Sequence, residues 1–218
     1  MTRLFIAILI SVCCFSAAHA QIVDVEQSEK FNTDSVLRDF DNRPFFGIYK
    51  DNYFVGGTSI GTKPTSHNSD VKFQVSISQR LTKSVLPFNT YAFLFYSQKC
   101  MWNVFEKSLP MRDFNFNPGL GFTKLLISKN RLVGKLTLMI EHESNGRDKM
   151  YDRSWNKLSF AGNIYLTPNL MIHGKYWLTY IDSKQNKDIL RYNGIYQTGI
   201  QVLSPNQRWV FSATFVKR

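Results

Sequence analysis

Apolar and polar residues alternate along most of this chain, in segments about ten residues long that polar turns separate. Residues 71–78 are the clearest case, because Val71, Phe73 and Val75 alternate with polar side chains. Successive side chains of a β-strand point to opposite faces, so such a segment predicts a strand with one apolar and one polar face. After a polar stretch at 21–43, the pattern predicts nine strands, at residues 45–60, 70–82, 89–104, 113–128, 132–144, 155–167, 170–181, 191–203 and 207–216.

The composition of the two faces separates two all-β architectures. Lys, Gln and Ser populate the polar face, and they suit the wet interior of a membrane barrel whose apolar face contacts lipid. The predicted fold is therefore an all-β, antiparallel transmembrane β-barrel, with a soluble β-sandwich or lipocalin-like barrel as the alternative. Past residue 20 no run approaches the roughly eighteen apolar residues of a transmembrane helix. Aromatic residues near strand ends suit interfacial girdles: Phe45, Phe46, Tyr53, Trp102, Phe105, Tyr151 and Trp155.

Residues 1–20 have the pattern of a cleaved secretory signal peptide. Arg3 is the charged start, residues 4–12 are apolar, and Ala18 and Ala20 form a small-residue cleavage site before residue 21. Cleavage would lower the net charge from +11 to +10, because Arg3 is the only charged residue removed. The basic balance favours anionic lipid headgroups or lipopolysaccharide phosphates as contacts, or reflects a generally basic surface. Only Cys100 would remain, so no intramolecular disulfide is expected.

The remaining chain predicts one barrel domain. We expect residues 21–43 to form a periplasmic N-terminal segment that folds over the barrel mouth, and residues 44–218 to form the barrel. Bacterial single-chain barrels usually have an even number of strands, and nine strands leave two open edges. The chain also stops at Phe215-Val216-Lys217-Arg218 without a terminal aromatic residue. These features predict a truncated barrel, seen as an open curved sheet.

A base, a nucleophile and an orienting amide converge on two neighbouring strands. His142 and Ser144 continue the apolar face of the strand at 132–144, and Asn156 shares the apolar face of the next strand. With a periplasmic N-terminus, the turn after Ser144 and the turn that holds Ser108 lie at the same extracellular rim. A serine hydroxyl needs a neighbouring base to take its proton, and a third group can hold the imidazole in one tautomer. A neutral amide suits a lipid-facing site, where an unpaired carboxylate would be costly.

At these residues the chain resembles the bacterial outer membrane phospholipase A family. The matching motifs are His142-Glu143-Ser144-Asn145-Gly146-Arg147, Arg153-Ser154-Trp155-Asn156 and the segment from Ser108 to Pro118. Weaker matches keep their order over roughly residues 45–215. The family barrel has twelve strands, so the resemblance implies that three C-terminal strands are missing. It also implies that Ser144 is the nucleophile, His142 the general base and Asn156 the group that orients the imidazole.

The resemblance further implies a calcium site whose ligands come together across a dimer. The matching positions are the Ser108 side chain, the Arg147 carbonyl and residue 152, where Asp152 stands in place of an expected serine. Oxygen ligands suit calcium, and a carboxylate should bind it more tightly than a hydroxyl. Asp152 as a solvated loop residue is the alternative, and the nearby Asp182 is not assigned. Glu141 and Glu143 face the lumen, where pairing with Lys or Arg is expected, and His173 and Cys100 are expected to be passive.

The resulting prediction is a calcium-dependent outer-membrane phospholipase of the A1/A2 type that hydrolyses acyl esters of glycerophospholipids. Membrane phospholipids and a second copy of the chain are the expected partners, and no nucleic acid is expected. The alternatives are an inactive truncated barrel remnant and a passive porin-like barrel.

Overall fold

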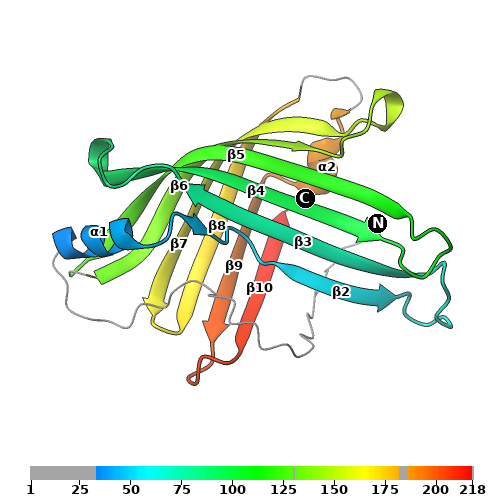
Figure 1. Cartoon of the computed structure of the whole chain (residues 1–218), viewed down its shortest axis with the longest axis horizontal. Coiled ribbons are helices and arrows are strands. Elements are labelled where there is room, and N and C mark those ends of the chain that lie inside the picture. The colour runs from blue at the N-terminus through cyan, green and yellow to red at the C-terminus, as the bar shows by residue number, and fades with distance from the viewer. Residues whose placement is uncertain (1–32, 130, 182–185, 218) are drawn as a thin grey trace.

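One antiparallel sheet that curls along its length makes up most of the molecule in the computed structural model, which describes residues 33–129, 131–181 and 186–217 (Figure 1). The elements are α1 (Thr33–Asn42), β1 (Phe46–Gly47), β2 (Tyr53–Thr58), β3 (Ser69–Arg80), β4 (Thr90–Trp102), β5 (Met111–Ser128), β6 (Arg131–Ser144), β7 (Ser154–Thr167), β8 (Leu170–Tyr180), α2 (Ile189–Asn193), β9 (Tyr196–Leu203) and β10 (Val210–Lys217). Short 3₁₀ turns occupy Pro87–Asn89 and Lys149–Tyr151. The predicted signal peptide at 1–20 lies outside the described residues.

From β3 to β10 each strand pairs with the next strand in sequence, and β1 and β2 both pair with β3. In the described part of the chain the path ends at β10 on one side and at β1 and β2 on the other, so the sheet is open. The nine predicted strands are confirmed, with the first one interrupted. Between the pairs Gly47↔Ser78 and Tyr53↔Gln74, residues 48–52 stand against only residues 75–77 of β3. The extra residues leave the ladder and fold against the inner face.

The two faces of the sheet differ as the alternation predicts. On β6 the side chain of Ile140 is 66% exposed on the convex face, whereas the next residue, Glu141, is 2% exposed on the concave face. On β7 Phe160 is exposed, and Ser159 beside it is buried. No helix within the described residues is long and apolar enough to cross a membrane. An apolar outer face and a polar inner face are what a membrane-embedded sheet requires.

The end of the predicted N-terminal segment is a helix, which the absence of clear periodicity did not predict. Leu37 and Phe40 of α1 pack on Tyr91 and Leu125 at the concave face. The buried Arg80 guanidinium donates hydrogen bonds to the carbonyl oxygens of Phe40, Asp41 and Arg43 at the end of the helix. The last carbonyls of a helix lack amide partners within it, so Arg80 adds hydrogen bonds where the helix ends. The helix lies where β4 begins and β5 ends, at the rim opposite the turn after Ser144.

Two other predictions are wrong in detail. Trp155 does not belong to an exposed girdle, because it is 6% exposed and lies on the concave face, opposite in parity to Asn156. The strand predicted at 191–203 begins only at Tyr196. The preceding residues form α2, which ends at Gly194; its backbone φ is 73°, and its N–H donates a hydrogen bond to the Leu190 carbonyl. A positive φ is readily adopted by glycine, so the helix stops there.

Candidate active site

Cross-strand register brings the predicted base and its orienting amide into direct contact. His142 of β6 stands opposite Asn156 of β7, and Nδ1 of the imidazole lies 2.9 Å from Oδ1 of the amide. With the amide oxygen as acceptor, Nδ1 carries the proton and Nε2 keeps its lone pair. Both side chains are on the exposed convex face. In that tautomer, Nε2 is free to take up a proton.

Ser144 lies at the end of β6, two residues beyond His142 on the same face. It is half-buried and stands opposite Ser154 of β7 and Phe116 of β5. Among residues 33–129, 131–181 and 186–217, no hydrogen bond joins the Ser144 hydroxyl to His142, so the contact between nucleophile and base stays a prediction. Catalytic hydrogen bonds are often long before substrate binds.

Apolar side chains border the three predicted catalytic residues on the convex face. Ile140 and Leu158 flank the His142–Asn156 pair along their own strands, and both are exposed. Phe116 stands beside Ser144, stacked on Phe114 with ring centroids 5.8 Å apart. Tyr180 of β8 lies opposite Asn156 and is 66% exposed. Sequence reasoning missed Phe116 and Tyr180 because neither belongs to the catalytic motif, although both share the parity of the apolar face.

The side chain of Asn145 stabilises the turn after Ser144, and Gly146 adopts a backbone conformation that favours glycine. Oδ1 of Asn145 accepts hydrogen bonds from the amides of Arg147 and Arg153, at 3.2 and 3.0 Å, and its Nδ2 donates to the Tyr151 carbonyl at 2.8 Å. Gly146 has a φ of 66°, and a Cβ there would lie 3.0 Å from the Phe116 ring. The Ser-Asn-Gly sequence therefore builds a tight, fixed turn directly after the predicted nucleophile.

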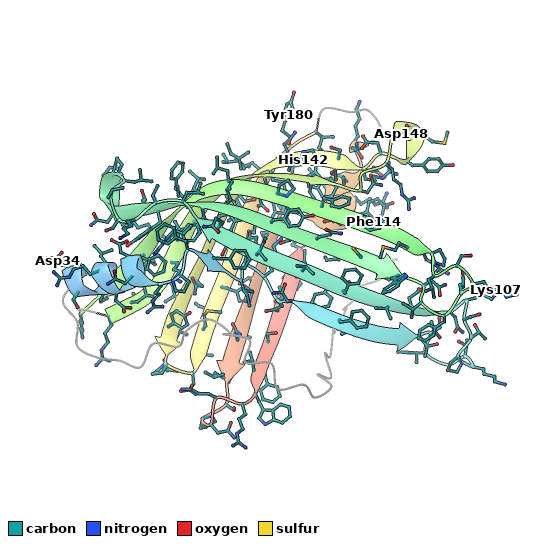
Figure 2. All side chains as sticks on the ribbon, viewed as in Figure 1. Asp34, Lys107, Phe114, His142, Asp148 and Tyr180 are labelled. Carbon is teal, nitrogen blue, oxygen red and sulfur yellow. The ribbon has the colours of Figure 1, made fainter. Side chains whose placement is uncertain are left out.

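The three predicted calcium ligands lie on two separate turns of the outer rim. Arg147 and Asp152 belong to the turn between β6 and β7, and Ser108 belongs to the turn between β4 and β5. Figure 2 labels Asp148 and Lys107 on these two turns, and the turns project apart. The described residues contain no group of three or more His, Cys, Asp or Glu side chains that could hold a metal ion. The oxygen donors of these three residues fit calcium chemically, but the residues do not come together within a single chain.

Each turn is fixed by its own contacts. The half-buried Asp152 accepts a hydrogen bond from the buried Asn186 at 3.5 Å, and the predicted neighbour Asp182 lies outside the described residues. On the Ser108 turn, Glu106 contacts His67 and Arg112 at 3.0 and 3.1 Å. The hydrogen bond from His67, followed by that from Arg112, lowers the pKa of the Glu106 carboxyl.

An open hollow of about 350 Å³ lies at the β6–β7 turn. It is lined by Gly146, Arg147, Asp148 and Tyr151.

On the concave side of the same strands, the acidic residues are paired with lysines. Glu141 contacts Lys175 and Glu143 contacts Lys157, and Asn115 adds a hydrogen bond to Glu143 at 2.8 Å. The predicted pairing of the two inner carboxylates is confirmed. They face away from His142 and Ser144, so they belong to the interior of the sheet.

The fold identifies the class of protein to which this chain belongs. A curled antiparallel sheet with an apolar outer face and an ion-paired inner face has the architecture of the outer-membrane β-barrels. The family model described as phospholipase A1 matches residues 35–216, and the chain belongs to this family of enzymes. The resemblance inferred from the motifs is confirmed.

Individual relatives agree with this assignment. Phospholipase A1 of Klebsiella pneumoniae is 26% identical over 213 residues, which cover 89% of this chain and 74% of that protein. For other curated relatives the match spans between about half and two thirds of their length, 50% and 62% in two cases.

Two solved structures have similar folds. The Salmonella typhi outer membrane phospholipase, a dimer with bound calcium, has a TM-score of 0.68 and 24% identity, covering 86% of this chain and 77% of that one. An Escherichia coli outer membrane phospholipase A with an asparagine-to-alanine change in its active site has a TM-score of 0.67 and 26% identity, covering 82% of this chain and 74% of that one.

Proposed function

We propose that this chain acts as a calcium-dependent outer-membrane phospholipase that hydrolyses acyl esters of glycerophospholipids. The observation that carries the proposal is the His142–Asn156 pair, joined at 2.9 Å on the apolar convex face and two residues from Ser144. A polar pair on a lipid-facing surface costs free energy, so its presence there points to a function. The neighbouring Ile140, Leu158 and Phe116 provide apolar surface on which acyl chains can lie.

The proposed reaction divides ester hydrolysis into two steps. Ser144 Oγ gives its proton to Nε2 of His142 as it attacks the ester carbonyl carbon. The bond to the glycerol oxygen then breaks, and Nε2 returns the proton to that oxygen, which leaves a lysophospholipid and an acyl-serine. A water molecule then gives a proton to Nε2 and attacks the acyl carbon; the bond from that carbon to Ser144 Oγ breaks, Nε2 returns the proton to Oγ, and the fatty acid is released. Asn156 keeps the proton on Nδ1 throughout, so that Nε2 faces the reacting atoms.

Ser108, Arg147 and Asp152 are the proposed calcium ligands, through a hydroxyl, a main-chain carbonyl and a carboxylate. A bound calcium ion would supply positive charge near the oxyanion that develops on the ester. Because Ser108 lies on a different turn from the other two, we propose that a second copy of the chain completes the site. The Salmonella typhi relative, a dimer with bound calcium, supports this arrangement.

The proposed location is the outer membrane, with the β6–β7 turn on the outside and phospholipids of the outer leaflet as substrates. Its support is the exposed apolar band on the convex face and the family of outer membrane phospholipases to which the solved relatives belong. A signal peptide at residues 1–20 would direct the export.

Replacing Ser144 tests the proposal directly. In phospholipid–detergent micelles with calcium, we expect Ser144→Ala to lower ester hydrolysis by at least ~10³-fold, the scale for losing a triad member. Ser154→Ala, which changes the serine directly opposite on β7, is the matched control and should keep its activity. Hydrolysis that survives Ser144→Ala would refute the catalytic assignment. A folded parent chain without hydrolysis would favour the passive-barrel alternative.

A sulfonyl fluoride reagent gives a second, turnover-independent measurement. We expect it to modify Ser144 and to react much more slowly when His142 is replaced, because the reagent requires an activated serine. Mass spectrometry of the labelled peptide identifies the modified residue. Equal labelling of Ser144 and Ser154 would contradict an activated nucleophile at Ser144.

A further inference from the structure

The backbone ladder between β5 and β6 is interrupted at His142. The pairs Phe116↔Ser144 and Gly119↔Glu141 belong to one continuous register, but the two positions between them form no regular pair. In that register residue 118 stands opposite His142, and residue 118 is a proline, which has no N–H. Both interrupted positions require the same bond, from the amide of residue 118 to the His142 carbonyl. Pro118 therefore deprives the predicted general base of a backbone hydrogen bond.

The side chain of Asn117 supplies the missing donor. Its Nδ2 donates to the His142 carbonyl at 3.0 Å, and Asn117 is 4% exposed on the concave face. Its Oδ1 accepts a hydrogen bond from Nζ of Lys50, also at 3.0 Å. The amide is thus fixed at both ends, and its orientation is set by the His142 carbonyl, which can only accept.

Lys50 is one of the extra residues of the interrupted first strand, and hydrogen bonds to β3 hold this segment in place. Its main-chain amide donates to Ser76 Oγ at 3.0 Å, and Oδ1 of Asn52 accepts from the Ser76 amide at 2.5 Å. Ser76 is fully buried and shares a hydrogen bond with Ser97 at 2.7 Å. A continuous set of hydrogen bonds therefore runs from β3 through Lys50 and Asn117 to the backbone of His142.

From this arrangement we infer that Asn117 is a positioning residue for His142, which it holds through the backbone carbonyl from the opposite face of the sheet. The inference rests on the proposed function. Fixing the His142 carbonyl fixes the peptide planes beside it, and with them the direction in which the imidazole leaves the strand toward Ser144. Small displacements of a catalytic group cost large factors in rate.

Two substitutions and one control test the donor. We expect Asn117→Ala to lower kcat for phospholipid hydrolysis roughly tenfold with little change in KM, because substrate does not touch Asn117. Asn117→Asp keeps an oxygen for Lys50 and loses the donor, so it should lose as much. Asn163→Ala is the matched control, since Asn163 is another inner-face amide with a hydrogen bond, to Met171, and it should keep kcat. An unchanged kcat in Asn117→Asp would overturn the inference.

A rescue experiment separates positioning from general support of the fold. Replacing Pro118 with alanine restores an N–H opposite the His142 carbonyl, so Asn117→Ala combined with Pro118→Ala should recover most of the lost kcat. The rate of sulfonyl fluoride labelling at Ser144 should fall and recover in parallel. A double variant as slow as Asn117→Ala, with the same urea unfolding midpoint as the parent, would show that the carbonyl bond does not position His142.

Failure of this inference is distinguishable from failure of the proposed function. If Ser144→Ala abolishes hydrolysis while Asn117→Ala and Asn117→Asp do not slow it, the catalytic assignment stands and only the positioning role is lost. If Ser144→Ala leaves hydrolysis intact, both are refuted.

Discussion

The two faces of β6 differ in almost every property, although their residues alternate along one strand. On the convex face, Ile140, His142 and Ser144 are exposed or half-buried, and the imidazole has a hydrogen bond to one neutral amide. On the concave face, Glu141 and Glu143 are shielded and paired with lysines. The convex face carries the predicted catalytic groups. The concave face connects β6 to β7, β8 and β5 through ion pairs and a hydrogen bond.

This difference shows how the predicted lipid-facing site can be rigid without a core on its own side. An enzyme in solution surrounds its catalytic groups with packed side chains, but the predicted catalytic groups here face outward. The fixed elements lie behind them, in ion pairs and in the hydrogen bond from Asn117 to the His142 carbonyl. Changes to the convex-face groups should therefore affect rate, and breaking the concave ion pairs should affect stability, whereas Asn117 affects rate from the concave face through the His142 backbone.

The largest effect is expected on the convex face. His142→Ala should lower phospholipid hydrolysis by at least ~10³-fold, because the serine loses its base. Unfolding in urea should be unchanged, because the imidazole is exposed. The matched control is His173→Ala, which removes an imidazole from the inner-facing side of β8 and should keep the activity. A comparable loss of activity in both variants would remove the distinction between the faces.

The next largest effect is expected on the concave face. Lys175→Met leaves the Glu141 carboxylate without its partner, and the two side chains are 10% and 2% exposed. Breaking a buried ion pair in this way costs about 3 kcal/mol. We expect a lower urea midpoint, followed by the fluorescence of the buried Trp155 and Trp177, while kcat of the folded fraction is kept. The exposed Lys107→Met serves as the control; equal midpoints in the two variants would contradict the prediction.

A smaller effect on rate is expected from the orienting amide. Asn156→Ala should lower kcat by between about ten- and a hundredfold, because the imidazole keeps its chemistry and loses only its fixed orientation. Hydrolysis by this variant should therefore remain well above that of Ser144→Ala when both are measured side by side. Equal losses at the two positions would mean that Asn156 does more than orient.

The smallest effect of a single substitution is expected at the rim rather than on the faces. Chelation should abolish hydrolysis, and Asp152→Asn should raise the calcium concentration for half-maximal activity several-fold, since one anionic ligand is lost. The control is Asp113→Asn, at an exposed position near the start of β5. A calcium titration that does not distinguish the two variants would identify Asp152 as a solvated loop residue.

Local periodicity was sufficient for the strands and for the face on which each predicted catalytic residue lies. The parity shared by His142, Ser144 and Asn156 follows from the two-residue repeat of a strand, and the register of β6 and β7 then places His142 opposite Asn156. The same parity would have placed Trp155 on the inner face. Trp155 is not part of a girdle because alternation along the strand, and not its position near the strand end, decides which face it occupies.

By itself, the sequence determined the nine-strand antiparallel sheet, its apolar and polar faces, and the family of the chain, because these depend on short-range patterns and specific motifs. Only the tertiary structure decided how the strands support the predicted site. The insertion of residues 48–52, the contact of Lys50 with Asn117, and the replacement of the Pro118 bond join segments that are distant in sequence. Which residues meet across a sheet depends on register and bulges, and periodicity along a single strand does not specify these.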